Sequence, residues 1–286
     1  MFLSKRANAK INLSLDLTGI LPNGYHAIHT VMQSVSLCDT VSVDTSRSGI
    51  SLRCDAPGVP VNEKNTAFRA AALFYEALGA APAAAIEIQK RIPSQAGLGG
   101  GSADAAAALD ILNELHGFPL DTQKLLETAL KIGADVPFAL LGGTRWCQNI
   151  GEITAELPHV PAHVLIAKPE AGVSTALAFR KFDAGAPLRH PDNDTLLYYF
   201  AKGAHKEALR HANNLFEQLL DIPAGEEIKR AMAEAGAYYT SLSGSGSAYY
   251  GLFDTAEAAE RAREKLLTVV PFVACCETVQ KGVQPA

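Results

Sequence analysis

The segment that most constrains this chain is a glycine-dense loop between an expected strand and an expected helix. The stretch Pro93–Asp104 reads PSQAGLGGGSAD and places four glycines within five residues. Glycines lack the Cβ atom that would keep a ligand from the backbone. The free backbone N–H groups at the start of a helix then attract anions, because the helix dipole is positive there. The loop therefore predicts a site for a phosphate group, and a triphosphate fits this chemistry.

Two familiar phosphate loops do not match this segment. A Walker A loop ends in Gly-Lys-Ser/Thr, and this loop contains no lysine. A dinucleotide-binding loop has a third glycine where Ser102 stands. The remaining alternative is a tight strand-to-helix turn without a ligand, and the density and position of the glycines favour phosphate binding over it.

If a bound triphosphate gives its terminal phosphoryl group to an alcohol, the site also needs a group that accepts the proton of the attacking hydroxyl. Asp135, in the segment Gly133–Phe138, is the best-placed loop carboxylate. An Asp two residues before a proline is also a natural helix N-cap, and local sequence favours that role, although the two roles can coincide. On an expected strand, Lys10, Asn12 and Ser14 share one face by alternation. That face is either solvated or the wall of a site, and the pattern leaves both open.

An aromatic residue and a histidine follow a turn near the start of the chain. Tyr25 and His26 come directly after the turn residues Asn23 and Gly24. Such a pair can stack on a planar ligand and hydrogen-bond to it. Packing of the loop is the commoner role, so the pair alone does not predict a ligand.

The order of expected elements predicts an α+β protein with two domains. Period-2 alternation predicts strands in the first forty-odd residues, and helical spacing predicts the helices that follow them. The second half has the strand–helix–strand–strand–helix–strand order of a ferredoxin-like domain, with extra helices inserted. Prolines near residues 150–165 indicate the boundary, so we expect domains at 1–155 and 156–286. The helices are expected at 65–78, 105–115, 121–133, 211–220, 225–235 and 256–267, and the later strands at 86–89, 163–168, 237–242, 247–253 and 272–278.

Charge and cysteine content restrict the class of protein. The net charge of −5 gives no support to a nucleic-acid partner. Five cysteines without a Cys-x-x-Cys pair fit no closed disulfide framework and indicate reduced thiols. The start of the chain lacks the apolar run of a signal peptide, and no stretch has the ~20 apolar residues of a membrane span. We therefore expect a cytoplasmic protein that acts on a small molecule, with no membrane association and no obligate protein partner.

Several segments together resemble the GHMP kinase family. They occur in the family's order along the chain: Ala9–Leu13, Gly24–His26, Pro93–Ala103, Gly133–Phe138 and Ser243–Ser247. The glycine loop alone indicates only the superfamily. Lys10 together with Gly24-Tyr25-His26 narrows the resemblance to the members that phosphorylate the 2-hydroxyl of 4-diphosphocytidyl-2-C-methyl-D-erythritol in non-mevalonate isoprenoid synthesis. The resemblance implies an N-terminal domain like ribosomal S5 domain 2 and a C-terminal ferredoxin-like domain.

The resemblance also assigns roles to residues. It implies that Lys10 and Asp135 are the catalytic pair, with Asp135 taking or holding the proton of the attacking hydroxyl. It implies that Asn12, Tyr25 and His26 bind the substrate, the last two at its cytosine. Mg²⁺ is implied as the companion of ATP, with metal ligands left unknown. Related enzymes cover the other cytosine face with an aromatic residue, for which Phe179 and Phe182 both stay open. ATP is expected on Asn65, Lys90, Pro93, Ser94, Gln95, Ala96, Gly97, Leu98, Gly99, Gly100, Gly101, Ser102 and Ala103.

Two other functions compete with this hypothesis. The first is another GHMP kinase, acting on homoserine or a mevalonate-pathway substrate, in which the Gly24–His26 segment would have no cytosine to bind. The second is a nucleotide- or RNA-binding module without activity. The acidic net charge argues against RNA. The presence of both Lys10 and Asp135 argues against an inactive kinase.

Overall fold

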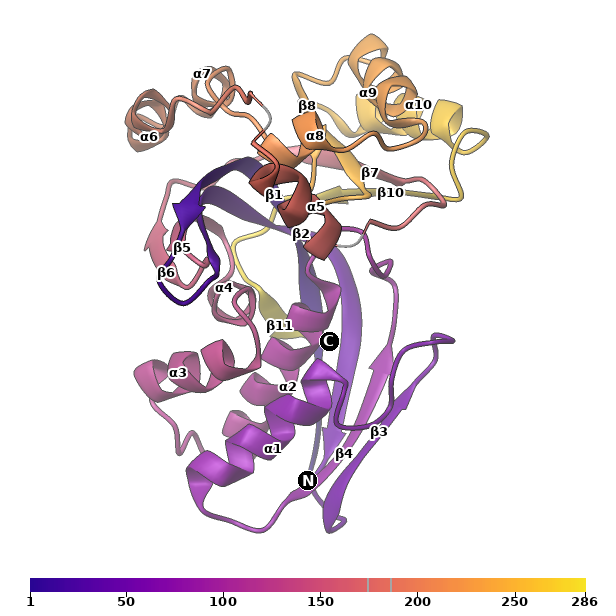
Figure 1. Cartoon of the computed structure of the whole chain (residues 1–286). Coiled ribbons are helices and arrows are strands. Elements are labelled where there is room, and N and C mark those ends of the chain that lie inside the picture. Colours follow the sequence, from indigo (N-terminus) through magenta and orange to yellow (C-terminus); the bar gives the residue numbers. More distant parts are fainter. Residues whose placement is uncertain (174, 186) are drawn as a thin grey trace.

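Two long antiparallel strands organise the first half of the chain. The computed structural model describes residues 1–173, 175–185 and 187–286. Strands β1 (Phe2–Ile20) and β2 (His26–Asp44) form a hairpin that runs through most of the molecule (Figure 1). The strand order of the first sheet is β11-β1-β2-β4-β3, and β5 pairs with the opposite end of β2 and with β6. The bounds are β3 Gly49–Cys54, β4 Ala83–Gln89, β5 Thr144–Asn149, β6 Ile153–Glu156 and β11 Val283–Pro285.

Helices cover one face of this first sheet (Figure 1). Asn65 caps α1 through its side chain, which accepts from the Ala67 N–H at 2.9 Å, and Asp121 caps α3 in the same way. The buried faces of α1 and α2 are rich in alanine, so the two helices pack closely on each other and on the sheet. The bounds are α1 Thr66–Leu78, α2 Gly100–Leu115, α3 Thr122–Ile132 and α4 Val136–Leu141.

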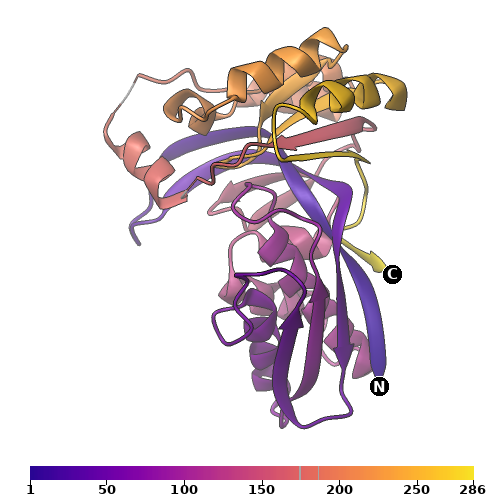
Figure 2. The same cartoon turned by 90° about the vertical axis from the view of Figure 1, so that its right-hand side faces the viewer.

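The second sheet has the strand order β10-β7-β9-β8, all antiparallel. Numbered within this sheet, the order is 4-1-3-2, which is the ferredoxin-like arrangement. Helices α9 and α10 lie on its outer face (Figure 2). The strands are β7 His163–Lys168, β8 Tyr239–Leu242, β9 Tyr249–Phe253 and β10 Phe272–Glu277; the helices are α5 Thr175–Asp183, α6 Asn193–Ala201, α7 His205–Leu209, α8 Leu215–Leu219, α9 Gly225–Glu234 and α10 Ala256–Leu266.

The inner face of the second sheet packs directly on β1. Buried side chains of β1, β7 and β9 belong to one apolar core, and a second core lies between the second sheet and its outer helices. Two tyrosine hydroxyls also join the sheets: Tyr250 donates to the Asn12 carbonyl at 2.7 Å and Tyr239 to the Leu13 carbonyl at 2.9 Å. These contacts hold β1, which carries Lys10, against the second sheet.

The structure confirms the two-sheet α+β fold expected from the sequence and differs in detail. The helix expected over 211–220 is only α8, because the side chain of Asn214 caps it at the Phe216 N–H. Strand β11 was not expected, and it brings the last residues back to the first sheet beside β1. The proposed boundary between residues 155 and 156 stays a prediction. Among the helices that the structure describes, none has the length and apolar character needed to cross a bilayer.

Candidate active site

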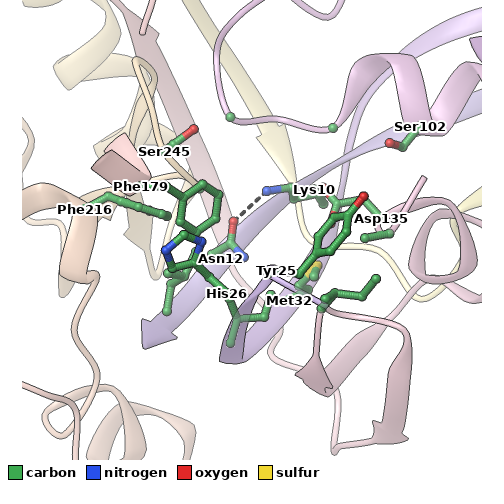
Figure 3. A pocket seen from close by; sticks show the side chains of 18 of the residues that line it. Lys10, Asn12, Tyr25, His26, Met32, Ser102, Asp135, Phe179, Phe216 and Ser245 are labelled. Carbon is green, nitrogen blue, oxygen red and sulfur yellow. Dashed lines mark hydrogen bonds between the residues drawn. The ribbon is translucent and has the colours of Figure 1, made fainter. Parts of the chain in front are cut away.

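A cavity of about 730 Å³ lies where the glycine loop, the β1–β2 hairpin and α5 meet (Figure 3). Its walls come from parts of the chain that are far apart in the sequence. They include β1, the turn before β2, the first turn of α2, the residue before α4, helices α5 and α8, and the β8–β9 loop. A cavity of this size accommodates a ligand as large as a nucleotide derivative.

The glycine loop sits between β1 and the β8–β9 loop. The Lys10 N–H donates to the Leu98 carbonyl at 3.0 Å, and the Ser243 hydroxyl donates to the Gly97 carbonyl at 3.0 Å. Gly97 has φ +74°, and a Cβ built on it would lie 1.9 Å from the Ser243 carbonyl oxygen. Glycine is therefore required at Gly97 for both conformation and space. Helix α2 begins at Gly100, so its first backbone N–H groups have no partner within the helix.

Lys10 is buried beside this loop. Its ammonium donates to the Asn12 Oδ1 at 2.6 Å, and the Asn12 amide donates in turn to the Thr30 hydroxyl at 2.9 Å. A Cβ on Gly99 would lie 3.0 Å from the Lys10 Cγ, so the lysine stem lies against the loop. Burial lowers the pKa of Lys10, and the negative charge of Asp135 opposes that shift. Lys10 is thus a buried basic side chain held at the glycine-loop end of the cavity.

Asp135 occupies the N-cap position of α4 but does not act as a side-chain cap. Its carboxylate makes no capping hydrogen bond to the helix, unlike those of Asp121 and Asp192. Instead, Asp135 lines the cavity together with Lys10 (Figure 3). The position that local sequence assigns to a cap therefore leaves the carboxylate available to a ligand. Burial, followed by the Asp135 charge, raises the pKa of the neighbouring Cys147 to about 12.

Ser14 does not join Lys10 and Asn12 in the cavity wall. The pairing of β1 with β2 shifts between Asn12 and Ser14, which is a β-bulge. After the bulge Leu15 lines the cavity, whereas the Ser14 hydroxyl donates to the Asn213 carbonyl at 3.3 Å. Strict alternation predicted that Ser14 shares a strand face with Lys10 and Asn12. That prediction is wrong because a bulge inserts one extra residue and changes which residues share a face.

The other end of the cavity is aromatic. Tyr25, which is 62% exposed, and His26 both line it. The His26 ring stacks on Phe179 with centroids 4.4 Å apart, whereas Phe182 meets it edge-on at 5.8 Å. Phe179 lines the cavity, and Phe182 is absent from its lining. The Asp183 carboxylate is 2.7 Å from the His26 Nε2, so this end of α5 is held on His26 by stacking and by a polar contact.

The residues expected to bind ATP fall into three groups. Gly97, Gly99 and Ser102 line the main cavity. A smaller cavity of about 200 Å³ on the loop is lined by Lys90 and Ile92 and by all residues from 93 to 101. Asn65 and Ala103 line neither cavity, since Asn65 is the α1 cap and Ala103 is buried. Adenine binding at Asn65 and Lys90 stays a prediction.

Some residues that line the main cavity were not expected there from the sequence. The main cavity also includes Gly244 and Ser245, which belong to the Ser243–Ser247 segment that carried part of the resemblance. That segment could therefore have pointed to Gly244 and Ser245 as cavity residues. The apolar residues of the lining had no such signal, because their side chains look like ordinary core: Leu15, Ile28, Met32, Ile150 and Phe216. Within the described residues, no three His, Cys, Asp or Glu side chains group in a way that could hold a metal ion.

Comparisons with known proteins identify the family of this chain. The GHMP kinases N terminal domain matches residues 65–143 and the GHMP kinases C terminal domain matches residues 196–271. A 4-diphosphocytidyl-2-C-methyl-D-erythritol kinase of Clostridium botulinum is 37% identical over 267 residues, which cover 91% of this chain and 94% of that one.

Two solved structures share the fold. A crystal structure of 4-(cytidine 5'-diphospho)-2C-methyl-D-erythritol kinase has a TM-score of 0.78 at 32% identity and covers 96% of this chain and 99% of its own. A homoserine kinase from Cytophaga hutchinsonii has the same TM-score at 21% identity, covering 100% and 97%, and this likeness shows the fold alone. The two domain matches and the relatives above 30% identity show that the chain belongs to the GHMP kinases, within the family of 4-diphosphocytidyl-2-C-methyl-D-erythritol kinases.

Proposed function

We propose that this protein transfers the terminal phosphoryl group of ATP to the 2-hydroxyl of 4-diphosphocytidyl-2-C-methyl-D-erythritol, a step of non-mevalonate isoprenoid synthesis. One observation carries the proposal most directly. A single cavity contains the glycine loop and Lys10 at one end, Asp135 on its wall, and Tyr25 and His26 at the other end. A substrate with a reacting alcohol and a distant planar base fits that arrangement.

The residues divide the work of phosphoryl transfer, which depends on positioning and on neutralising charge. The N–H groups at the start of α2 and the glycine loop bind the phosphates of ATP. Asp135 accepts the proton of the attacking hydroxyl or orients that hydroxyl by a hydrogen bond. Lys10, positioned by Asn12, offsets the negative charge that develops as the phosphoryl group moves.

The magnesium ion would arrive with ATP. Mg²⁺ in nucleotide sites keeps several waters and takes one or two protein oxygens together with the phosphates. The cavity offers the Ser102 hydroxyl beside the glycine loop, which is an oxygen donor of that kind. This residue would hold the ion, and when bound the ion supplies charge neutralisation at the phosphates.

The proposed reaction involves only small molecules. ATP and the cytidyl substrate are both metabolites of the cell interior, so we assign the enzyme to the cytoplasm. All five cysteines are free thiols, which fits a reducing compartment. No protein or nucleic-acid partner enters the proposal.

A coupled kinase assay with the full chain tests the function. We expect ATP-dependent phosphorylation of the cytidyl substrate, with kcat/KM far above the values for homoserine and mevalonate. This panel is needed because the homoserine kinase fold matches as well as the cytidyl kinase fold. Preference for homoserine or mevalonate would reject the substrate assignment. MgATP binding without turnover on any alcohol would reject the enzyme.

Phe179, rather than Phe182, is proposed as the aromatic residue that completes the cytosine site. Phe179 lines the cavity and stacks on His26, whereas Phe182 packs edge-on. We expect Phe179→Ala to raise KM for the cytidyl substrate by roughly tenfold or more, since stacking on a base contributes ~1–3 kcal/mol. The matched control Phe182→Ala should change that KM far less, and neither should change KM for ATP. A larger effect of Phe182→Ala in steady-state kinetics would reverse the assignment.

A further inference from the structure

A buried asparagine joins two separate parts of the cavity wall. Asn214, the N-cap of α8, is 1% exposed. Its Nδ2 donates to the Leu242 carbonyl at 2.7 Å and to the Gly244 carbonyl at 3.0 Å, and its Oδ1 accepts from the Phe216 N–H at 3.0 Å. A buried amide is costly unless its hydrogen bonds are made, so these three bonds fix the β8–β9 loop, residues 243–248, relative to α8.

The β8–β9 loop needs this asparagine because β8 is an edge strand. The second sheet ends at β8, so backbone groups on the outer side of that strand require partners other than a strand. Leu242 finds both of its partners at α8, since its N–H donates to the Glu217 carboxylate at 2.8 Å and its carbonyl accepts from Asn214. The Asn214 amide also reaches beyond the strand to Gly244, which lines the main cavity.

The β8–β9 loop is in turn attached to the nucleotide end of the cavity. In addition to the Ser243 hydroxyl bond described above, the Ala248 N–H donates to the Ala96 carbonyl of the glycine loop at 3.1 Å. A Cβ on Gly244 would lie 3.1 Å from the Lys10 Nζ, so the backbone of the loop also lies against this side chain. A displaced β8–β9 loop would therefore leave both the glycine loop and Lys10 without part of their support.

The oxygen of the same amide acts at the aromatic end of the cavity. Its bond to the Phe216 N–H begins α8, and the Phe216 side chain lines the cavity (Figure 3). The Phe216 ring meets Phe179 edge-on with centroids 5.1 Å apart, and Phe179 stacks on His26. The two sides of the Asn214 amide thus serve different ends of the cavity, with Nδ2 at the glycine loop and Oδ1 at the aromatic residues.

We propose that Asn214 is a positioning residue for phosphoryl transfer, whose amide nitrogen holds the β8–β9 loop, and through it the glycine loop and Lys10, in the arrangement that binds MgATP. Asn214 is not among the described residues that line the main cavity, so it acts through these backbone contacts. Without the two donated bonds, the loop would occupy its position in only a fraction of the molecules, and the affinity for MgATP would fall by that fraction. The inference rests on the proposed function in one respect, which is that the glycine loop binds ATP.

The first test variant removes only the two donated bonds. Serine caps helices about as well as asparagine does, so Asn214→Ser keeps an acceptor at the start of α8 and loses the bonds to Leu242 and Gly244. We expect its Kd for MgATP to rise about tenfold, the effect of losing two hydrogen bonds of ordinary net strength. Calorimetry on the full chain without acceptor measures this Kd. KM for the cytidyl substrate should rise less than about threefold, because the aromatic end keeps its cap.

The second variant, Asn214→Ala, removes the cap as well. It should show the same loss of MgATP affinity and also raise KM for the cytidyl substrate above the value for Asn214→Ser, because the start of α8 no longer fixes Phe216. Asn113→Ala is the matched control. Asn113, 5% exposed near the end of α2, makes two hydrogen bonds of 3.0 Å with the Leu120 backbone. This control should lower the free energy of unfolding in urea to a similar extent and leave the MgATP Kd and both KM values unchanged.

Amide hydrogen exchange without nucleotide tests the position of the loop directly. In Asn214→Ser the Ala248 N–H should exchange at least about tenfold faster than in the wild type, because its bond to Ala96 opens with the loop, whereas Asn113→Ala should keep the wild-type rate. An unchanged Kd for MgATP in Asn214→Ser would overturn the inference and leave the proposed function standing. An equal loss of affinity in Asn113→Ala would also overturn it, because the effect would then follow stability alone. No MgATP binding by the wild type would overturn both the inference and the proposed function.

Discussion

The Asp135→Asn variant should lose roughly two to four orders of magnitude in kcat, the usual contribution of a positioned general base. Its KM for ATP and for the cytidyl substrate should change only a few-fold. The reason is that Asp135 acts on a proton that moves in the transition state, whereas binding relies on the loop and the aromatic end of the cavity. Steady-state kinetics with both substrates varied measure the two effects separately.

Stability measurements separate catalysis from helix capping at Asp135. Asn is itself a good N-cap, so the variant that tests capping is Asp135→Ala. The Asp135 side chain makes no capping bond, and this variant should therefore keep the wild-type free energy of unfolding. The control is Asp121→Ala, which removes a true cap of α3. The Asp121→Ala control should lower the free energy of unfolding in urea by about 1 kcal/mol and leave kcat unchanged. If Asp135→Ala instead lost about 1 kcal/mol of stability and kept its kcat, Asp135 would be only a cap.

Local patterns in the sequence were enough for much of the fold. Periodicity predicted the helices on the first sheet, and the order of elements predicted a ferredoxin-like second sheet, which the strand order confirms. Both succeed because the signals are local: apolar spacing sets a helix face, and Asn65 and Asp121 mark helix starts. Strand β11 has only three residues, and it pairs with a strand almost the whole chain away. No local pattern encodes that pairing.

The candidate site was predictable where a residue's chemistry is unusual for its position. Four glycines after a strand, and a carboxylate next to a Val-Pro pair, stand out in the printed sequence. Phe179 and Phe182 do not, because they lie three residues apart on one helix and face similar directions. Only the packing of α5 against β2 shows that Phe179 stacks on His26. Likewise, Lys90 looks like a surface lysine until the fold brings two carboxylates to it.

The shared fold bears on which part of the molecule would select the substrate under the proposed function. The homoserine kinase and the cytidyl kinase superpose on this chain equally well, so the sheets and helices do not discriminate between alcohols. Discrimination has to come from side chains that the fold holds in the cavity. Tyr25, His26 and Phe179 form an aromatic end of the cavity opposite the glycine loop. That end is the part of the cavity suited to a base.

Gly97→Ala should be the most damaging change in the glycine loop. The residue has φ +74°, and a Cβ there would lie 1.9 Å from the Ser243 carbonyl oxygen and 2.8 Å from its carbonyl carbon. Backbone strain and the steric overlap together should cost roughly 3 kcal/mol or more in urea unfolding. Relief of the overlap would require the loop and the β8–β9 turn to separate, so affinity for MgATP should fall at least about tenfold in the molecules that stay folded.

Gly79→Ala is the matched control, because it has the backbone strain of Gly97→Ala without the steric overlap with a neighbouring loop. Gly79 ends α1 with φ +67°, a similar backbone conformation, and no atom lies within 4 Å of its added Cβ. The Gly79→Ala control should lower the free energy of unfolding by only about 1 kcal/mol and leave MgATP binding intact. The difference between the two variants then measures the contact between the glycine loop and the β8–β9 loop. If both variants lost the same stability and both bound MgATP normally, the close approach at Gly97 would have no part in forming the nucleotide site.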